Sequence, residues 1–193
     1  MILYQRFALI YLSLICIVIR YPDSPTPVGK DTYDTLFMSN TILEFGEARW
    51  ILSFYSYFGF FPFSDSSSYL VLLSAFSALS GIDIYLTLLI VNIFVSILST
   101  QVIFLLSRIF LHSNNLCLLS THILLLTPIF VRYTSWNATP RGITMIFILI
   151  LILLFFQILL RKFKLVILFL LLSLITLAFH KLSVYVFVLF VVS

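Results

Sequence analysis

The chain has 193 residues, of which 62% are hydrophobic and only 9% are charged. Soluble domains average roughly half apolar and a quarter charged residues, so this composition excludes a water-soluble globular domain. The net charge of +4 does not indicate nucleic-acid binding, because Arg161, Lys162 and Lys164 form the single basic cluster,. The composition predicts an all-α, polytopic transmembrane helix bundle whose main partner is the lipid bilayer.

Segments without any Asp, Glu, Lys or Arg recur along the whole chain. Because charge at a bilayer centre costs about 2.5–3.5 kcal/mol on insertion scales, such segments are candidate membrane helices. They cover residues 7–19, 66–82, 84–107, 116–131, 142–160 and 165–180. A span needs about 20 apolar residues, so we expect about five to seven spans. Residues 66–80 are short and rich in serine, so they either cross the membrane or lie on its surface.

Residues 1–20 are predicted to form an uncleaved signal-anchor helix. They lack a small-residue cleavage site and run into Tyr21-Pro22,. Arg6 and Arg20 are expected to extend their charged ends to the two membrane interfaces. Cys16 and Cys117 both fall in apolar sequence, which predicts buried free thiols rather than a disulfide.

Residues 21–83 are predicted to form an external loop that lies along the membrane surface. All seven acidic residues of the chain fall within it, so any chemistry of the chain is expected to concentrate here. Asp31-Thr-Tyr-Asp34 has the spacing of a capping box, and the apolar residues that follow predict an amphipathic surface helix that ends at Gly46. The aromatic-rich residues 50–63 are expected at the lipid headgroups.

Residues 84–193 are predicted to form a transmembrane bundle of antiparallel helices. Asn92, Gln101 and His122 lie in the predicted spans, where hydrogen-bonded helix contacts are expected of them. The chain stops inside an apolar run, residues 183–193, that is too short to span a bilayer,. We therefore expect the sequence to be the N-terminal portion of a longer protein.

This order of features resembles the GT-C superfamily of membrane glycosyltransferases, which includes protein O-mannosyltransferases, aminoarabinose transferases and oligosaccharyltransferases. A signal anchor, an acidic external loop with surface helices, a glycine-terminated helix at 66–81 and antiparallel spans follow one another as in that family. The basic turn that begins at Arg108 resembles its cytoplasmic turn, and Leu-Leu-Thr-Pro128 resembles the end of its next span. Several branches have an adjacent acidic pair, whereas two residues separate Asp31 from Asp34 here.

The resemblance implies roles for the acids of the loop and for three basic groups. Asp31 is the first and Asp34 the second candidate for a catalytic base, which must lie within about 3 Å of the acceptor hydroxyl. Arg141, His180 and Lys181 are the candidates for binding the phosphate of a polyprenyl-phosphate-linked sugar donor. A divalent metal stays open as a cofactor, and the sugar and the acceptor are unassigned.

Each candidate also has a structural interpretation that the sequence leaves open. Asp31 and Asp34 can serve only to cap a helix, and the cations can serve only as interfacial anchors. The alternative function is a non-catalytic membrane protein, such as a transporter or an assembly subunit. The predicted spans hold no carboxylate, which argues against an ion-coupled carrier, since transporters usually place ionisable residues at mid-membrane.

The orientation is taken from the resemblance, because charge barely decides it. With residues 21–83 on the non-cytoplasmic side of a plasma membrane, five basic residues lie inside and six outside, so the positive-inside rule is nearly neutral. If residues 66–80 span and the N-terminus is outside, seven lie inside and four outside. The rule slightly prefers this second topology.

Overall fold

The computed structural model describes residues 2–22, 24–47, 51–52, 60–61, 68–160 and 163–180. Most of these residues are helical, and the strands among them form one short antiparallel pair. In chain order the elements are α1 (Ile2–Arg20), α2 (Lys30–Phe45), β1 (Ile51–Leu52), β2 (Phe60–Phe61), α3 (Ser68–Ser80), α4 (Ile84–Phe110), α5 (Asn114–Leu125), α6 (Pro128–Thr134), α7 (Pro140–Leu159), η2 (Phe163–Leu165) and α8 (Val166–Phe179). The predicted helical architecture is thus confirmed for the part described.

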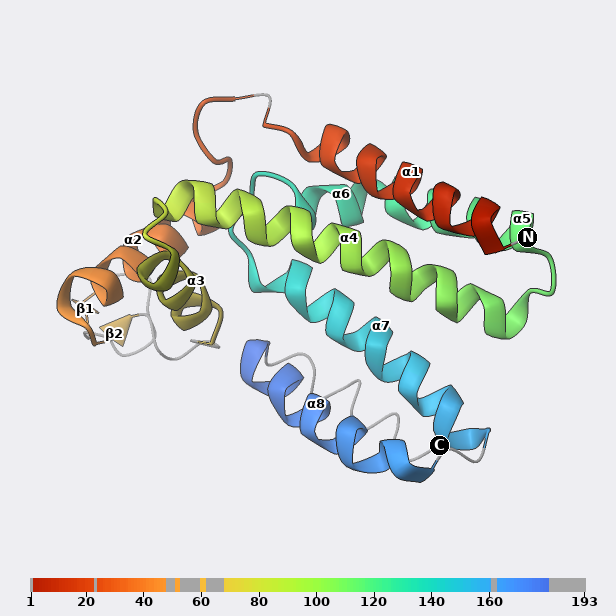
Figure 1. The fold of residues 1–193 in the computed structure, drawn as a ribbon. Helices are drawn as coiled ribbons and strands as arrows, with labels where there is room; N and C mark the ends of the chain where they lie inside the picture. Colours follow the sequence, from red (N-terminus) through yellow and green to blue (C-terminus); the bar gives the residue numbers. More distant parts are fainter. Residues whose placement is uncertain are drawn as a thin grey trace.

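α4 lies at the centre of the bundle (Figure 1). It contacts α1, α5, α7, α3, α2 and α6, while α8 packs against α7. Two clusters of buried side chains join these helices. One includes Leu73 of α3 and Leu88 of α4 and extends to α2, α7 and the end of α8. The other includes Leu12 of α1 and Ile103 of α4 and extends to α5 and α6.

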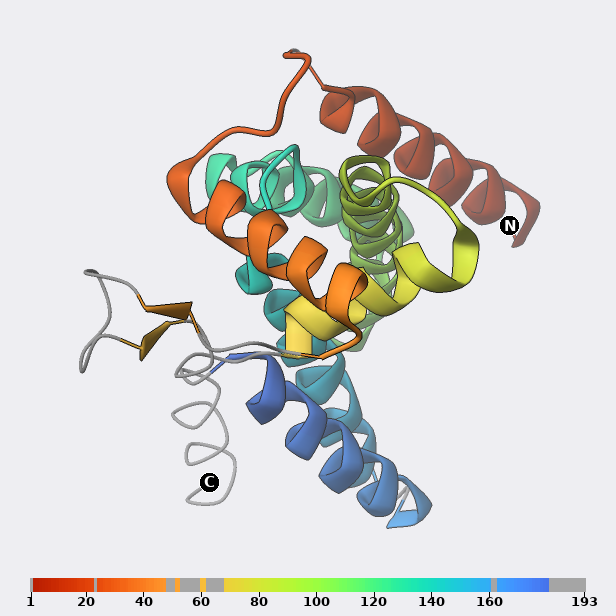
Figure 2. The same ribbon diagram turned by 90° about the vertical axis from the view of Figure 1, so that its left-hand side faces the viewer.

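α2 and α3 pack against each other across one end of the bundle (Figure 2). α2 buries Leu36 and Ser39, and the Ser74 hydroxyl of α3 donates to the Ser39 carbonyl at 2.8 Å. Gly46 and Gly81 follow the two helices with φ values of 71° and 68°. Their N–H groups each donate at 2.9 Å to the carbonyl four residues earlier. Both helices therefore end at the predicted glycines.

Within the described ranges, two helices are long and apolar enough to cross a membrane, α4 with 27 residues and α7 with 20. α5 and α6, bent by 64°, make a third if the pair is one span. For this part of the chain the count is below the five to seven expected of the whole sequence, because α3 and α8 have only 13 and 14 residues where a bilayer requires about 20. The long apolar helices indicate a membrane protein. That α1 also crosses the membrane stays a prediction.

The span predicted at residues 116–131 is not one continuous helix, because the helix breaks at Thr127-Pro128. Proline has no N–H to donate and disfavours the helical conformation of the residue before it. Thr127 accordingly has a ψ of 127°, and α6 begins at Pro128. The segment is a broken span or a re-entrant loop.

The bundle has small polar side chains in its interior and apolar side chains on its outer surface, as expected for a membrane protein. Cys16 and Cys117 are buried free thiols, as predicted, and the Cys16 sulfur lies 3.3 Å from Thr100 Oγ1 across the α1–α4 contact. Small polar side chains of this kind allow membrane helices to approach closely. On the outside, Ile167 and Leu174 of α8 are 72% and 65% exposed, which suits contact with lipid rather than water.

Candidate functional site at one end of the bundle

The first turn of α2 is docked onto the segment between α6 and α7. The Thr32 hydroxyl lies 2.7 Å from both the Val28 carbonyl and Asn137 Oδ1, and it accepts the N–H of Ala138 at 3.0 Å. The Val28 N–H donates to the Trp136 carbonyl at 2.9 Å. Thr32 and Asn137 are 105 residues apart in the sequence, so this contact is a product of the tertiary fold.

Asn92 of α4 holds the same segment. Its side-chain amide donates to the carbonyls of Ser135 and Asn137, the second at 3.1 Å, and the residue is buried. The prediction that Asn92 makes a hydrogen-bonded helix contact is therefore confirmed. Residues 135–138 are fixed between α4 and the start of α2.

Asp31 and Asp34 are both exposed on α2, but the predicted capping box is wrong. The helix begins at Lys30, its N-cap is Gly29 with a φ of 103°, and no side chain caps it. Glycine tolerates this backbone conformation, and the hydroxyl of Thr32 bonds to the docked segment instead. Asp31 lies within the first turn, where the helix dipole favours a negative charge.

Arg141 is exposed in the first turn of α7. Its Nη1 donates to the Tyr133 hydroxyl at 3.2 Å, and its guanidinium carbon lies 5.4 Å from the centre of the Tyr133 ring. Thr139 caps the helix by accepting the Arg141 N–H at 3.3 Å. Because Thr139 directly follows the segment docked on α2, Arg141 lies at the same end of the bundle as Asp31.

His180 follows α8 and is half-buried. Phe179, directly before it, stacks edge-on against Phe147 with ring centres 5.3 Å apart. Phe179 also belongs to the buried cluster that contains Leu36 of α2, so His180 lies at the same end of the bundle as the acids. Lys181 falls outside the described residues.

Arg20 was expected at the membrane interface, and this prediction is wrong because the residue is 1% exposed. Its Nε donates to Thr134 Oγ1 at 2.8 Å, and its Nη1 donates to the Cys16 carbonyl at 3.4 Å. Its guanidinium carbon lies 5.4 Å from the centre of the Phe130 ring. An arginine at the end of a predicted helix suits either an interface or an interior position, so the sequence had no signal for its burial.

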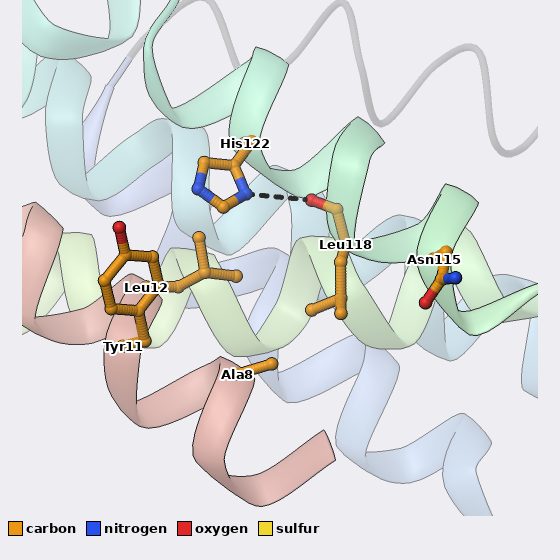
Figure 3. A pocket seen from close by; sticks show the side chains of 6 residues that line it. All are labelled: Ala8, Tyr11, Leu12, Asn115, Leu118 and His122. Atoms are coloured by element: carbon orange, nitrogen blue, oxygen red, sulfur yellow. Dashed lines mark hydrogen bonds between the residues drawn. The ribbon is translucent and has the colours of Figure 1, made fainter. Parts of the chain in front are cut away.

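A separate pocket lies between α1 and α5 (Figure 3). His122 Nδ1 is 3.3 Å from the Leu118 carbonyl of its own helix, so this hydrogen bond lies within α5 and is not the contact between helices that was predicted. The residues that line the pocket are Ala8, Tyr11, Leu12, Asn115, Leu118 and His122. None of the predicted site residues that the structure describes borders it.

The described residues form no metal-ligand cluster, and burial shifts the titration of Tyr69. Over the described ranges, no three His, Cys, Asp or Glu side chains come together as a metal-ligand set. Burial raises the pKa of Tyr69 in α3 above its ordinary value, because the phenolate is poorly solvated there. Tyr69 therefore stays neutral and contributes to the buried cluster rather than to proton transfer.

Comparison of the chain with models of known families, with curated proteins and with solved structures yields no match. The function is therefore inferred from the residues and their arrangement.

Proposed function

We propose that this protein is a membrane glycosyltransferase of the GT-C kind that takes its sugar from a polyprenyl-phosphate carrier. The observation that carries the proposal is the docking of α2 onto residues 135–138 through Thr32. This contact holds the turn that bears Asp31 near the start of α7, which bears Arg141. Transfer from a phosphate-linked donor requires these two kinds of group, an acid for the acceptor and a cation for the leaving phosphate.

In the proposed reaction the Asp31 carboxylate takes the proton of an acceptor hydroxyl or amide. The acceptor atom forms a bond to the anomeric carbon of the sugar, and the bond from that carbon to the phosphate oxygen breaks. The released polyprenyl phosphate is stabilised by Arg141 and His180, and Lys181 is assigned the same role from the sequence alone. Asp34 lies one turn after Asp31 and is assigned to binding the acceptor or a divalent metal.

The proposal also places the sugar donor at the membrane surface. A polyprenyl-phosphate donor keeps its chain in the bilayer and its phosphate at the surface. The exposed carboxylates of α2 and the exposed guanidinium of Arg141 are accessible to such a headgroup. We propose that this end of the bundle faces the non-cytoplasmic side of the plasma membrane.

The test compares Asp31→Asn with Glu44→Gln, which removes another exposed carboxylate at the far end of the same helix. Membranes that contain each variant receive radiolabelled polyprenyl-phosphate mannose, glucose or aminoarabinose, and label transferred to acceptors is counted. Loss of a general base typically costs about 10²–10⁴ in rate. Asp31→Asn should therefore lower transfer by about that factor, and Glu44→Gln should leave it unchanged.

Two other outcomes would contradict the proposal. If the wild-type chain transfers label and Asp31→Asn transfers it equally well, Asp31 has only a role at the helix terminus. If no wild-type transfer is seen with any of the three donors while the protein is folded in the membrane, the non-catalytic alternative is favoured.

A further inference from the structure

Three buried polar groups without a hydrogen-bond partner come from segments that meet beside α4. Over the described part of the chain, the buried side-chain atoms that lack a partner are Arg20 Nη2, Tyr69 Oη, Ser96 Oγ and Trp136 Nε1. Tyr69 lies on α3, in the cluster at the end of the bundle. The other three belong to α1, to α4 and to the segment after α6.

Contacts between α1 and α4 place two of these groups at the same level. The two helices run antiparallel (Figure 1), and Cys16 lies opposite Thr100, with 3.3 Å between sulfur and hydroxyl. Arg20 is one turn after Cys16, and Ser96 is one turn before Thr100. Residues four apart share a helix face, so Arg20 and Ser96 are in the same layer of the α1–α4 contact.

The segment after α6 brings the third group to this layer. Arg20 Nε donates to Thr134 Oγ1 at 2.8 Å, and Trp136 follows two residues later with 9% exposure. Asn92, one turn before Ser96 on α4, bonds to the carbonyls of the two residues that flank Trp136. The guanidinium, the hydroxyl and the indole therefore belong to one junction of three segments.

The chemistry of this junction is that of an anion site. The guanidinium and the indole N–H are donors only, and the hydroxyl can donate. α1, α4, α6 and residues 135–139 contain no Asp or Glu, and a buried charge without a counter-charge is strongly unfavourable. We propose that Arg20, Ser96 and Trp136 bind a small monovalent anion, chloride under physiological conditions. The three donor atoms are buried within the bundle, which favours a small ion over a lipid headgroup.

The test measures thermal unfolding of the purified protein in detergent, in sodium chloride and in sodium gluconate of equal ionic strength. Because a ligand that binds only the folded state stabilises it, the wild-type melting temperature should rise with chloride concentration. Trp136→Phe and Ser96→Ala each remove one donor and should raise the half-saturating chloride concentration, by roughly tenfold for the indole. Arg20→Met should abolish the chloride effect, whereas Arg132→Met, which removes an exposed arginine of α6, should retain it.

Two results would overturn the proposal. The first is a wild-type melting temperature that is equal in chloride and gluconate. The second is a half-saturating chloride concentration that stays at the wild-type value in both Trp136→Phe and Ser96→Ala. This pattern would assign the chloride effect to another part of the protein. If Arg20→Met fails to fold, the Trp136 and Ser96 variants decide the question alone.

Discussion

Gly142 shows how one residue allows the candidate site to form. It lies in the first turn of α7, where a Cβ would collide with the backbone carbonyl of Tyr133 and would lie 3.6 Å from Thr134 Cγ2. A backbone carbonyl yields less readily than the end of a flexible side chain. The absence of a Cβ therefore lets α7 begin directly against α6, with Arg141 over the Tyr133 ring.

Gly142→Ala should lower the free energy of unfolding by about 1–3 kcal/mol, the usual cost of overpacking. Alanine favours the helix by about 1 kcal/mol over glycine, so the two effects have opposite signs and the measurement decides between them. Unfolding in detergent of the variant and of the wild type gives the difference. Leu159→Ala, at the exposed far end of α7, is the control that should change stability little. A Gly142→Ala protein as stable as wild type would show that α6 can move aside.

At the scale of helices, the break between α5 and α6 determines where the junction around Arg20 lies. α5 follows α4 back along the bundle, and the 64° bend redirects the chain. α6 then places Phe130 and Thr134 against α1, where both contact Arg20. A continuous helix would direct these two side chains elsewhere, because a bend changes the direction of every residue after it.

Pro128→Ala should straighten this segment, since residue 128 regains an N–H that can donate to the Leu124 carbonyl. Spin labels at the exposed positions Leu119 and Arg132 should move apart by a few ångströms, towards about 20 Å, the length of 13 residues of continuous helix. Pro140→Ala is the matched control, because Pro140 occupies the first turn of α7, where proline is compatible with the helix,. If the label distance stays at its wild-type value in Pro128→Ala, packing rather than proline maintains the bend.

At the scale of the whole molecule, the antiparallel helices place their connecting segments at two opposite ends of the bundle. The first turn of α2, the end of α3 and the starts of α4 and α7 lie together, joined by the contacts of Thr32 and Asn92. The turn between α4 and α5 lies at the other end of α4, about 40 Å away for a helix of 27 residues,. A bilayer around α4 and α7 therefore places these two ends on opposite sides.

Single cysteines at Asp31 and Ser80 should react alike with an impermeant thiol reagent applied to intact cells, and a cysteine at His112 should react only after the cells are opened. All three positions are exposed, and the native Cys16 and Cys117 are buried, so they leave the assay undisturbed. Opposite labelling of positions 31 and 80 would show that α3 crosses the membrane. Labelling of His112 from outside would reverse the proposed orientation.

Local properties of the sequence determined the class of this protein and the ends of several helices. Long uncharged segments predict membrane helices because the cost of burying charge depends on composition alone. Gly46 and Gly81 end helices because a left-handed backbone is favourable for glycine without help from distant residues. The positions of Asp31, Asp34 and Arg141 near helix starts were likewise accessible from the sequence, although the cap of α2 was not.

Only the tertiary structure decided which of these groups meet. The Thr32–Asn137, Cys16–Thr100 and Arg20–Thr134 contacts join residues 105, 84 and 114 positions apart. Hydrophobic periodicity has no information on such pairs, because many helix arrangements bury the same apolar faces. Arg20 illustrates the point, since an interface and an interior position are equally compatible with an arginine that ends a helix. Its burial follows from the bend at Pro128, which brings the Thr134 hydroxyl within hydrogen-bond distance of the guanidinium.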